Sequence, residues 1–246
     1  MAQNGLHGIM GLTLARITSK EAREPGLAIT ARSSAYGFVM GNVLPDIDLI
    51  ALGVTYLFDS RLAMKMHRSA THSIFTIALV TFLGMLLSTT RGGKAFFRGL
   101  GTGMLCHSFV DIFLWLSSID ILWPLGYFGV RSEINLWTGI KVPPLWNNFL
   151  GATDFLMVAL FFGYLIRLSR KYETNTRLLP RLRAFAAFHW VCFPIYLGLS
   201  FFLSRTMFDI VQYSVIIVVS IPMTWMAVVG SRPTIERLGV SSIGYR

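Results

Sequence analysis

Residues 210–230 read IVQYSVIIVVSIPMTWMAVVG, a stretch with no charged side chain. A helix needs about 20 consecutive apolar residues to cross the hydrocarbon core of a bilayer. Two similar stretches precede it, at residues 142–166 and 184–204, and neither contains Lys or Arg. This repeated pattern predicts three transmembrane helices in the C-terminal part of the chain, within residues 142–231.

The composition extends this prediction to the whole chain. Of its 246 residues, 54% are hydrophobic and 14% are charged, whereas about 25% are charged in a soluble domain. The 22 Lys and Arg residues exceed the 12 Asp and Glu residues and give a net charge of +10. Because the basic residues flank long apolar runs, they favour contact with anionic membrane lipids over binding of nucleic acid.

Stretches without Lys or Arg divide the chain into candidate spans. Six of them have at least 21 residues: 33–60, 69–90, 99–130, 142–166, 184–204 and 206–231. We therefore predict an all-α, polytopic transmembrane bundle of about five to six spans, formed by one domain over residues 1–246. Asn42, Pro45, Asp46 and Asp48 interrupt the first stretch, which predicts a broken or re-entrant helix there.

The basic residues also predict the orientation, because Lys and Arg are retained in cytoplasmic loops. With six spans and a cytoplasmic N-terminus, 16 of the 22 basic residues lie on the cytoplasmic side. The sequence thus predicts that both termini are cytoplasmic, and that this orientation changes at the N-terminus if the first stretch does not span.

Acidic and histidine residues inside apolar stretches mark the candidate site. An unpaired charge at membrane depth costs at least about 2.5–3.5 kcal/mol, so several charges together require one another or a shared cation. All five glutamates lie in polar connections. The polar residues in or beside apolar stretches are Asp46, Asp48, Asp111, Asp120, Asp154, His72, His107 and His189.

The spacing of these residues predicts which of them converge. His107 and Asp111 are four residues apart, so on a helix they share a face and can hold one ion; a hydrogen bond that serves only packing is the alternative. Asp46 and Asp48 would diverge on a straight helix. Pro45 favours a chain break or a new helix start at that point, where the two carboxylates can converge; the alternative is a solvated turn.

The densest feature is His67-Arg68-Ser69-Ala70-Thr71-His72-Ser73. A helix that begins near His72, capped by Thr71 or Ser69, would leave His67 on the preceding turn and bring both imidazoles to one point. The Arg68 guanidinium suits a phosphate oxygen or a carboxylate. Carboxylates combined with imidazoles predict a divalent cation, zinc first and manganese or magnesium next.

Two further histidines, His7 and His189, each stand alone among apolar neighbours. A buried histidine of this kind usually serves the structure. His189 is left out of the candidate site on this ground.

The motifs occur in the order His7-x-x-x-Gly11, Leu44-Pro45-Asp46-Ile47-Asp48, His67-Arg68-x-x-Thr71-His72-Ser73 and His107-x-x-x-Asp111. This order resembles the YdjM-like family of bacterial inner-membrane, metal-dependent hydrolases over about residues 5–125. The resemblance implies a helical membrane protein with metal ligands among His7, Asp46, Asp48, His67, His72, His107 and Asp111. The chain departs from the family after Asp111, where Ser117-Ser118-Ile119-Asp120 and Trp123-Pro124-Leu125 replace a Gly-containing turn and a Tyr-Pro-Phe-like end.

Three functional hypotheses follow. The first is hydrolysis of a phosphoester in an amphiphilic substrate that enters from the bilayer, with a metal-activated water as the nucleophile. Asp48 or Asp120 would act as general base, and Arg68 would hold a phosphate oxygen. His7 would be a metal ligand or would orient one. The second is a non-catalytic membrane subunit in which the cluster is a structural metal site or a polar network. The third is a transporter, favoured by the interrupted span but not by the absence of an internal repeat.

Overall fold

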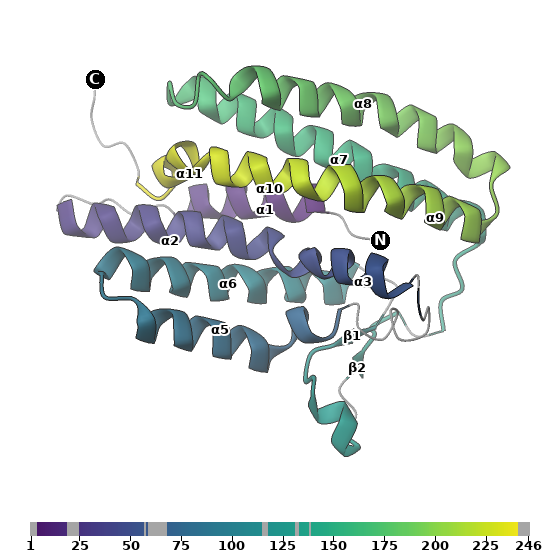
Figure 1. Cartoon of the computed structure of the whole chain (residues 1–246), viewed down its shortest axis with the longest axis horizontal. Coiled ribbons are helices and arrows are strands. Elements are labelled where there is room, and N and C mark those ends of the chain that lie inside the picture. The colour runs from purple at the N-terminus through teal and green to yellow at the C-terminus, as the bar shows by residue number, and fades with distance from the viewer. Residues whose placement is uncertain are drawn as a thin grey trace.

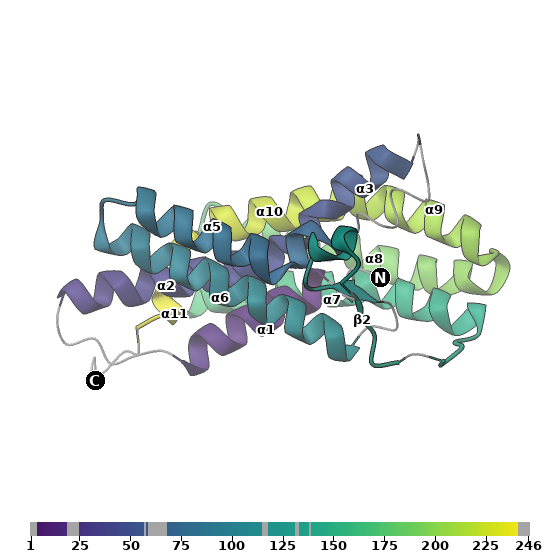
Figure 2. The same cartoon turned by 90° about the horizontal axis from the view of Figure 1, so that it is seen from below.

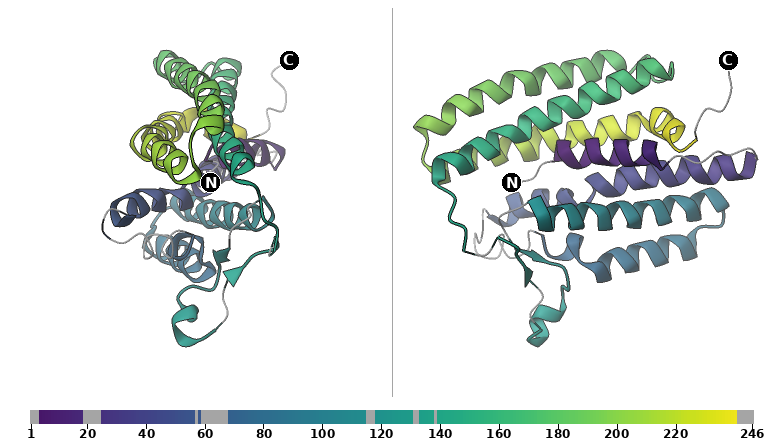
Figure 3. Two further views of the ribbon diagram at one scale, coloured as in Figure 1. Left: turned by 90° about the vertical axis from the view of Figure 1, so that its right-hand side faces the viewer. Right: turned by 180° about the vertical axis from the view of Figure 1, so that it is seen from behind.

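The structure, a computed structural model, describes residues 4–18, 25–56, 58, 68–114, 118–130, 133–137 and 139–240. Its helices lie side by side along one long axis, with α8 at one margin of the bundle and α5 at the opposite margin (Figures 1 and 3). The predicted all-α bundle is confirmed. Within the described residues, the regular strands are β1 (Ile119–Asp120) and β2 (Glu133–Ile134), an antiparallel pair with Asp120 opposite Glu133.

The N-terminal part of the bundle consists of helices joined in places by 3₁₀ turns. They are α1 (Asn4–Ile17), α2 (Pro25–Val43), the 3₁₀ turn η1 (Pro45–Ile47), α3 (Asp48–Tyr56), the 3₁₀ turn η2 (Ala70–His72), α5 (Ile74–Leu87) and α6 (Arg91–Leu114). Helix α1 packs against both α2 and α7. Helix α1 also contacts α10, which lies above it in the view of Figure 2.

The C-terminal part contains the longest helices. After the 3₁₀ turn η3 (Leu125–Phe128) come α7 (Pro144–Lys171), α8 (Leu179–Phe202), α9 (Arg205–Val215), the π-helical turn η4 (Ile216–Ser220), α10 (Ile221–Gly230) and α11 (Arg232–Leu238). Phe155 of α7 and Phe208 of α9 are fully or almost fully buried in a core that also holds Leu49 and Leu52 of α3. Through α3, this core joins the two parts of the chain.

Three helices of the described chain are long and apolar enough to cross a membrane: Pro144–Lys171, Leu179–Phe202 and Arg205–Gly230. A fourth candidate is the pair Gly26–Val43 and Pro45–Thr55, which is bent by 42°. The predicted break in the first span is therefore confirmed, and it falls at Pro45.

The number of candidate spans is slightly lower than the five to six predicted. Helix α5 has 14 residues, fewer than a span needs. Helix α6 begins at Arg91 and so includes the basic residues that we assigned to a loop, and it ends at Leu114. The rest of the stretch 99–130 forms a strand and a 3₁₀ turn where it is described.

Glycines bring α2 and α6 into direct backbone contact. A β-carbon on Gly41 would overlap the carbonyl oxygen of Leu100, and one on Gly103 would overlap that of Phe38. Gly37 and Gly99, one turn earlier on each helix, make equally close approaches to the other helix. Small residues four apart allow membrane helices to pack this closely. This glycine seam places the C-terminal end of α2 beside the middle of α6.

Candidate metal centre

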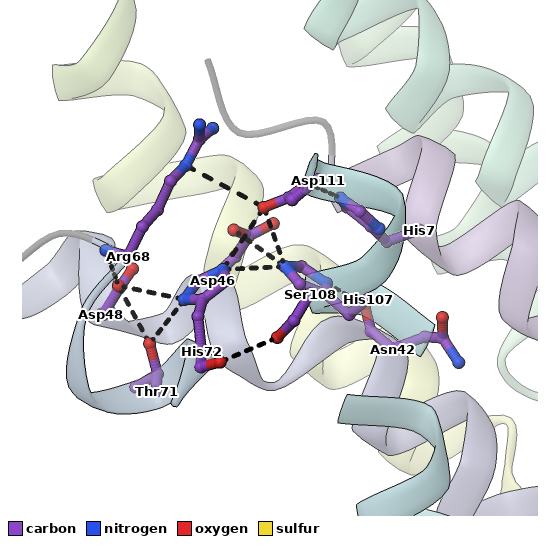
Figure 4. Close-up of polar contacts among 10 residues, drawn as sticks. All are labelled: His7, Asn42, Asp46, Asp48, Arg68, Thr71, His72, His107, Ser108 and Asp111. Carbon is purple, nitrogen blue, oxygen red and sulfur yellow. Dashed lines mark hydrogen bonds and ion pairs between the residues drawn. The ribbon is translucent and has the colours of Figure 1, made fainter. Parts of the chain in front are cut away.

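Four buried side chains converge where the end of α2 meets α6 (Figure 4). They are Asp46 of η1, His72 of η2, and His107 and Asp111 of α6. Each offers one potential ligand atom, and these atoms all lie within 4.8 Å of one another. All four residues are at most 1% exposed. Elements far apart in the sequence thus contribute to one polar cluster, which we call the centre.

The distances within the centre fit a shared cation. The Nε2 atoms of His72 and His107 are 3.1 Å apart. Nε2 of His107 lies 3.5 Å from Oδ1 of Asp46 and 3.5 Å from Oδ2 of Asp111, and Nε2 of His72 lies 3.4 Å from the same Asp111 oxygen. Two ligands about 2.0–2.1 Å from a tetrahedral zinc ion stand roughly 3.3–3.4 Å apart. The four residues could therefore hold one metal ion between them.

Hydrogen bonds define the tautomer of both histidines. Nδ1 of His107 lies 2.8 Å from the backbone carbonyl oxygen of Asn42, which can only accept. The Thr71 hydroxyl donates to Oδ2 of Asp48 at 3.0 Å, so it can only accept from Nδ1 of His72, also at 3.0 Å. Each neutral imidazole therefore carries its proton on Nδ1 and presents the lone pair of Nε2. Two lone pairs that face each other at 3.1 Å repel unless a cation or a shared proton lies between them.

The charge of the centre leads to the same conclusion. The centre and its neighbours contain three carboxylates, those of Asp46, Asp48 and Asp111, and one guanidinium, that of Arg68. With neutral imidazoles these described residues sum to −2, since three negative charges meet one positive charge. Both carboxylate oxygens of Asp46 are buried and accept no hydrogen bond from any described residue. A divalent cation would neutralise this charge, which is costly to bury alone.

The local sequence explains how each element presents its ligand. His107 and Asp111 share one face of α6, as their spacing predicts. Pro45 begins the 3₁₀ turn that directs Asp46 into the centre, and Asp48 then begins α3. The helix after His72 begins at Ile74 and is capped by Ser73, whose hydroxyl accepts from the Phe75 amide. Our assignment of the cap to Thr71 or Ser69 was therefore wrong, and His72 lies in the turn that precedes the cap.

Arg68 is held inside the protein in a strained backbone conformation. Its φ is 60°, which is rare for a residue other than glycine, and its side chain is 2% exposed. Its amide donates to Asp48 at 2.9 Å, its carbonyl accepts from the Asp120 amide at 3.1 Å, and its Nε lies 3.9 Å from Oδ2 of Asp111. These contacts place a buried positive charge beside the centre.

Asp48 and His7 lie next to the four converging residues: Asp48 contacts His72, and His7 contacts both Asp111 and His107. Asp48 accepts from Thr71, and its Oδ2 is 3.8 Å from Nδ1 of His72, on the side of the ring away from the centre. Nε2 of His7 is 2.9 Å from Oδ1 of Asp111, and its ring stacks on His107 with centroids 3.7 Å apart. Both residues are placed to orient ligands, a role that commonly supports metal binding.

Four histidine and aspartate positions remain, and one of them, Asp154, accepts a hydrogen bond from the Gln212 side chain at 2.9 Å. The prediction for His67 lies outside the described residues. Asp120 is tied to Arg68 through its backbone, and its carboxylate has no hydrogen bond or ion pair to the centre in the described part of the chain. His189 lies elsewhere: its Nδ1 is 2.7 Å from the Phe185 carbonyl and its Nε2 is 2.9 Å from the Ser220 hydroxyl.

Three contributors were not assigned by sequence reasoning. Thr71 links Asp48 to His72, the Asn42 carbonyl orients His107, and the Ser108 hydroxyl donates to the His72 carbonyl at 3.3 Å. A hydroxyl next to a candidate ligand is a usable signal for Thr71 and Ser108. A backbone carbonyl leaves no signal in the sequence, so the role of Asn42 could be found only in the structure.

Comparisons with known proteins place the chain in a family. No curated protein and no solved structure matches it. The family model of the YdjM inner membrane protein matches residues 1–207, a range that contains every residue of the centre and most of the bundle. The chain therefore belongs to the YdjM inner membrane protein family.

Proposed function

We propose that this protein is an integral-membrane, metal-dependent hydrolase that cleaves a phosphoester of an amphiphilic substrate. Asp46, His72, His107 and Asp111 would hold the cation, with Asp48, His7 and His67 as further ligands or as residues that orient ligands. The observation that carries the proposal is the convergence of two lone-pair nitrogens and two buried carboxylates on one point.

Zinc is the cation that this ligand set favours, because imidazole nitrogens and carboxylate oxygens at these distances suit tetrahedral coordination. Manganese and magnesium are the alternatives, since two carboxylates also suit harder ions. A bound divalent ion would supply a water of lowered pKa and would stabilise developing negative charge on a phosphoryl group.

The chain's own residues supply the remaining functions. The Arg68 guanidinium, buried beside Asp111, is suited to bind a non-bridging phosphate oxygen. Asp48 or Asp120 would accept the proton of the attacking water. Asp48 already accepts from the Arg68 amide and from Thr71, whereas Oδ1 of Asp120 is buried and accepts from no described residue.

The surroundings of the centre support an amphiphilic substrate. The centre lies at the break between the two helices of the bent apolar pair, so a polar headgroup could reach it while an apolar chain stays in the bilayer. We propose that the substrate is a lipid or a related phosphoester, and that the protein spans the bacterial inner membrane several times with both termini cytoplasmic.

A second candidate function is a non-catalytic membrane subunit in which the same residues form a structural metal site. The extreme burial of the four converging residues favours it, because structural sites are closed whereas catalytic sites keep an open position. The two functions make different demands on access: a hydrolase must admit water and a phosphoryl group, and a structural site must exclude them.

Metal analysis and turnover separate these functions. Detergent-purified wild type should contain stoichiometric divalent metal, and Asp46→Ala and His67→Ala should lose this metal. The wild type should release phosphate or headgroup from a panel of phospholipids and isoprenyl phosphates. The two variants should lack this activity. Metal retained without turnover on any member of the panel would support the structural site. A wild-type protein with no stoichiometric metal would overturn both.

A further inference from the structure

A small cavity separates the centre from α10. Its volume is about 10 Å³, close to the smallest cavity that admits one water molecule. It lies between η1 of the N-terminal part and α10 of the C-terminal part. Its lining consists of Val43, Asp46, Ile47, Ile221, Thr224 and Trp225.

The two polar side chains in this lining make no hydrogen bond within the described residues, although Oδ1 of Asp46 lies 3.5 Å from Nε2 of His107. Asp46 and Thr224 are each 1% exposed. Both carboxylate oxygens of Asp46 and the hydroxyl of Thr224 make no hydrogen bond to any described residue. Buried polar atoms are satisfied in the great majority of cases by protein or by ordered water. Here the residues that carry the unsatisfied donor and the unsatisfied acceptors line one cavity.

Comparison with other helical hydroxyls shows that Thr224 is unusual. Thr81, Thr102 and Ser214 each donate to the carbonyl four residues earlier, at 2.7–2.8 Å, the usual solution in an apolar helix. Thr224 does not. It follows the π-helical turn η4, a kind of distortion that often occurs at functional sites. Its hydroxyl therefore remains available to a ligand in the cavity.

We propose that this cavity binds one ordered water, which accepts a hydrogen bond from Thr224 and donates one to Asp46. The chemistry is complementary, because a hydroxyl donor and a carboxylate acceptor need a molecule that both accepts and donates. Two of the lining side chains, Ile47 and Trp225, are 37% and 36% exposed, so the cavity lies close to the surface of the bundle.

Thr224 is then a positioning residue for the centre. It would act through the water on the orientation of the Asp46 carboxylate, and so on the affinity of the centre for its cation. This consequence rests on the proposed function, whereas the water site itself does not. Thr224 lies beyond residues 1–207, the range that the family model matches. The proposed water therefore depends on a residue outside the range that defines the family.

Two variants test the inference. Thr224→Val removes the hydroxyl and keeps the shape, and Thr224→Ser keeps the hydroxyl. A high-resolution structure of the metal-free protein should show a water within hydrogen-bond distance of Asp46 in the wild type and in Thr224→Ser, but not in Thr224→Val. Competition with a chromophoric chelator should show zinc affinity about 10-fold lower in Thr224→Val, the lower end of the effect of residues that orient ligands, and unchanged in Thr224→Ser. The thermal midpoint of the metal-free valine variant should match the wild type, which shows that the variant folds.

Two results would overturn the inference: no water between Thr224 and Asp46 in the wild type, or a valine variant that keeps both the water and the wild-type zinc affinity. A protein that binds no zinc, yet holds the water in the wild type and loses it in Thr224→Val, would contradict the proposed function while supporting the water site.

Discussion

The N-terminal and C-terminal parts of this bundle both bury histidine, but in different ways. In the C-terminal part, each ring nitrogen of His189 has its own partner, and the ring packs among Phe155, Phe162 and Phe188. In the N-terminal part, His72 and His107 direct one nitrogen each at the other. The comparison teaches that burial of a polar residue does not indicate a site by itself. A site is indicated when buried polar groups converge without satisfying one another's hydrogen bonds.

The two parts also pack by different means. Helices α2 and α6 touch through backbone atoms at Gly41 and Gly103, whereas a β-carbon at Gly163 of α7 or Gly198 of α8 would meet open space. The C-terminal core is filled instead by large side chains such as Phe155 and Phe162. Close backbone contact leaves no room for a side chain between α2 and α6, the two helices that meet at the centre. Contact between large side chains tolerates more adjustment.

The strongest test of this comparison exchanges one buried histidine in each part for alanine. His72→Ala should lower the affinity for divalent metal by more than the about 100-fold loss that residues orienting ligands can cause, because it removes a ligand. His189→Ala should retain the metal and lose about 1–3 kcal/mol of stability, since the Ser220 hydroxyl is left without a partner. Mass-spectrometric metal analysis and thermal unfolding in detergent measure the two effects. Equal metal content in the two variants would contradict the difference between the parts.

A second test adds one methyl group to a glycine in each part. Gly41→Ala should lose about 1–3 kcal/mol of stability through overpacking against the Leu100 carbonyl. It should also bind less metal, because the adjacent Asn42 carbonyl orients His107. Gly163→Ala should be neutral or more stable by up to about 1 kcal/mol, since alanine favours the helix and meets nothing. Chemical unfolding in detergent compares them, and similar losses in both would disprove the importance of the glycine seam.

The smallest expected effect concerns a hydroxyl in each part. Thr71→Val should weaken zinc binding about 10- to 100-fold, because His72 loses the group that orients it, and Thr71→Ser should restore binding. Thr234 in α11 joins Ser169, Thr174 and Asn175 by hydrogen bonds, so Thr234→Val should reduce stability and leave zinc affinity unchanged. Chelator competition on the purified variants gives both affinities. A Thr71→Val protein with wild-type affinity would show that His72 is oriented by packing alone.

Much of the centre could be predicted from the sequence, because its signals are local. The interval of four residues between His107 and Asp111 determines that they share a helix face, and Pro45 determines where the first apolar stretch breaks. The partial failures also have local reasons. Our division of the chain at basic residues began the third stretch too late, at residue 99. Helix α6 already begins at Arg91, because Arg91, Lys94 and Arg98 are good helix residues that extend it.

The sequence by itself determined two things about this protein. Its apolar stretches require a lipid environment, and the aspartates and histidines within those stretches require binding partners. Only the tertiary structure decided which partners they find. The 3.1 Å between His72 and His107 depends on a glycine seam, a proline break and a turn before α5. The link from Asp46 to Thr224 depends on α10, which lies almost 180 residues further along the chain. The chemistry of each side chain follows from its residue type. The convergence of the ligand side chains depends on how the helices pack, and no spacing along the chain encodes it.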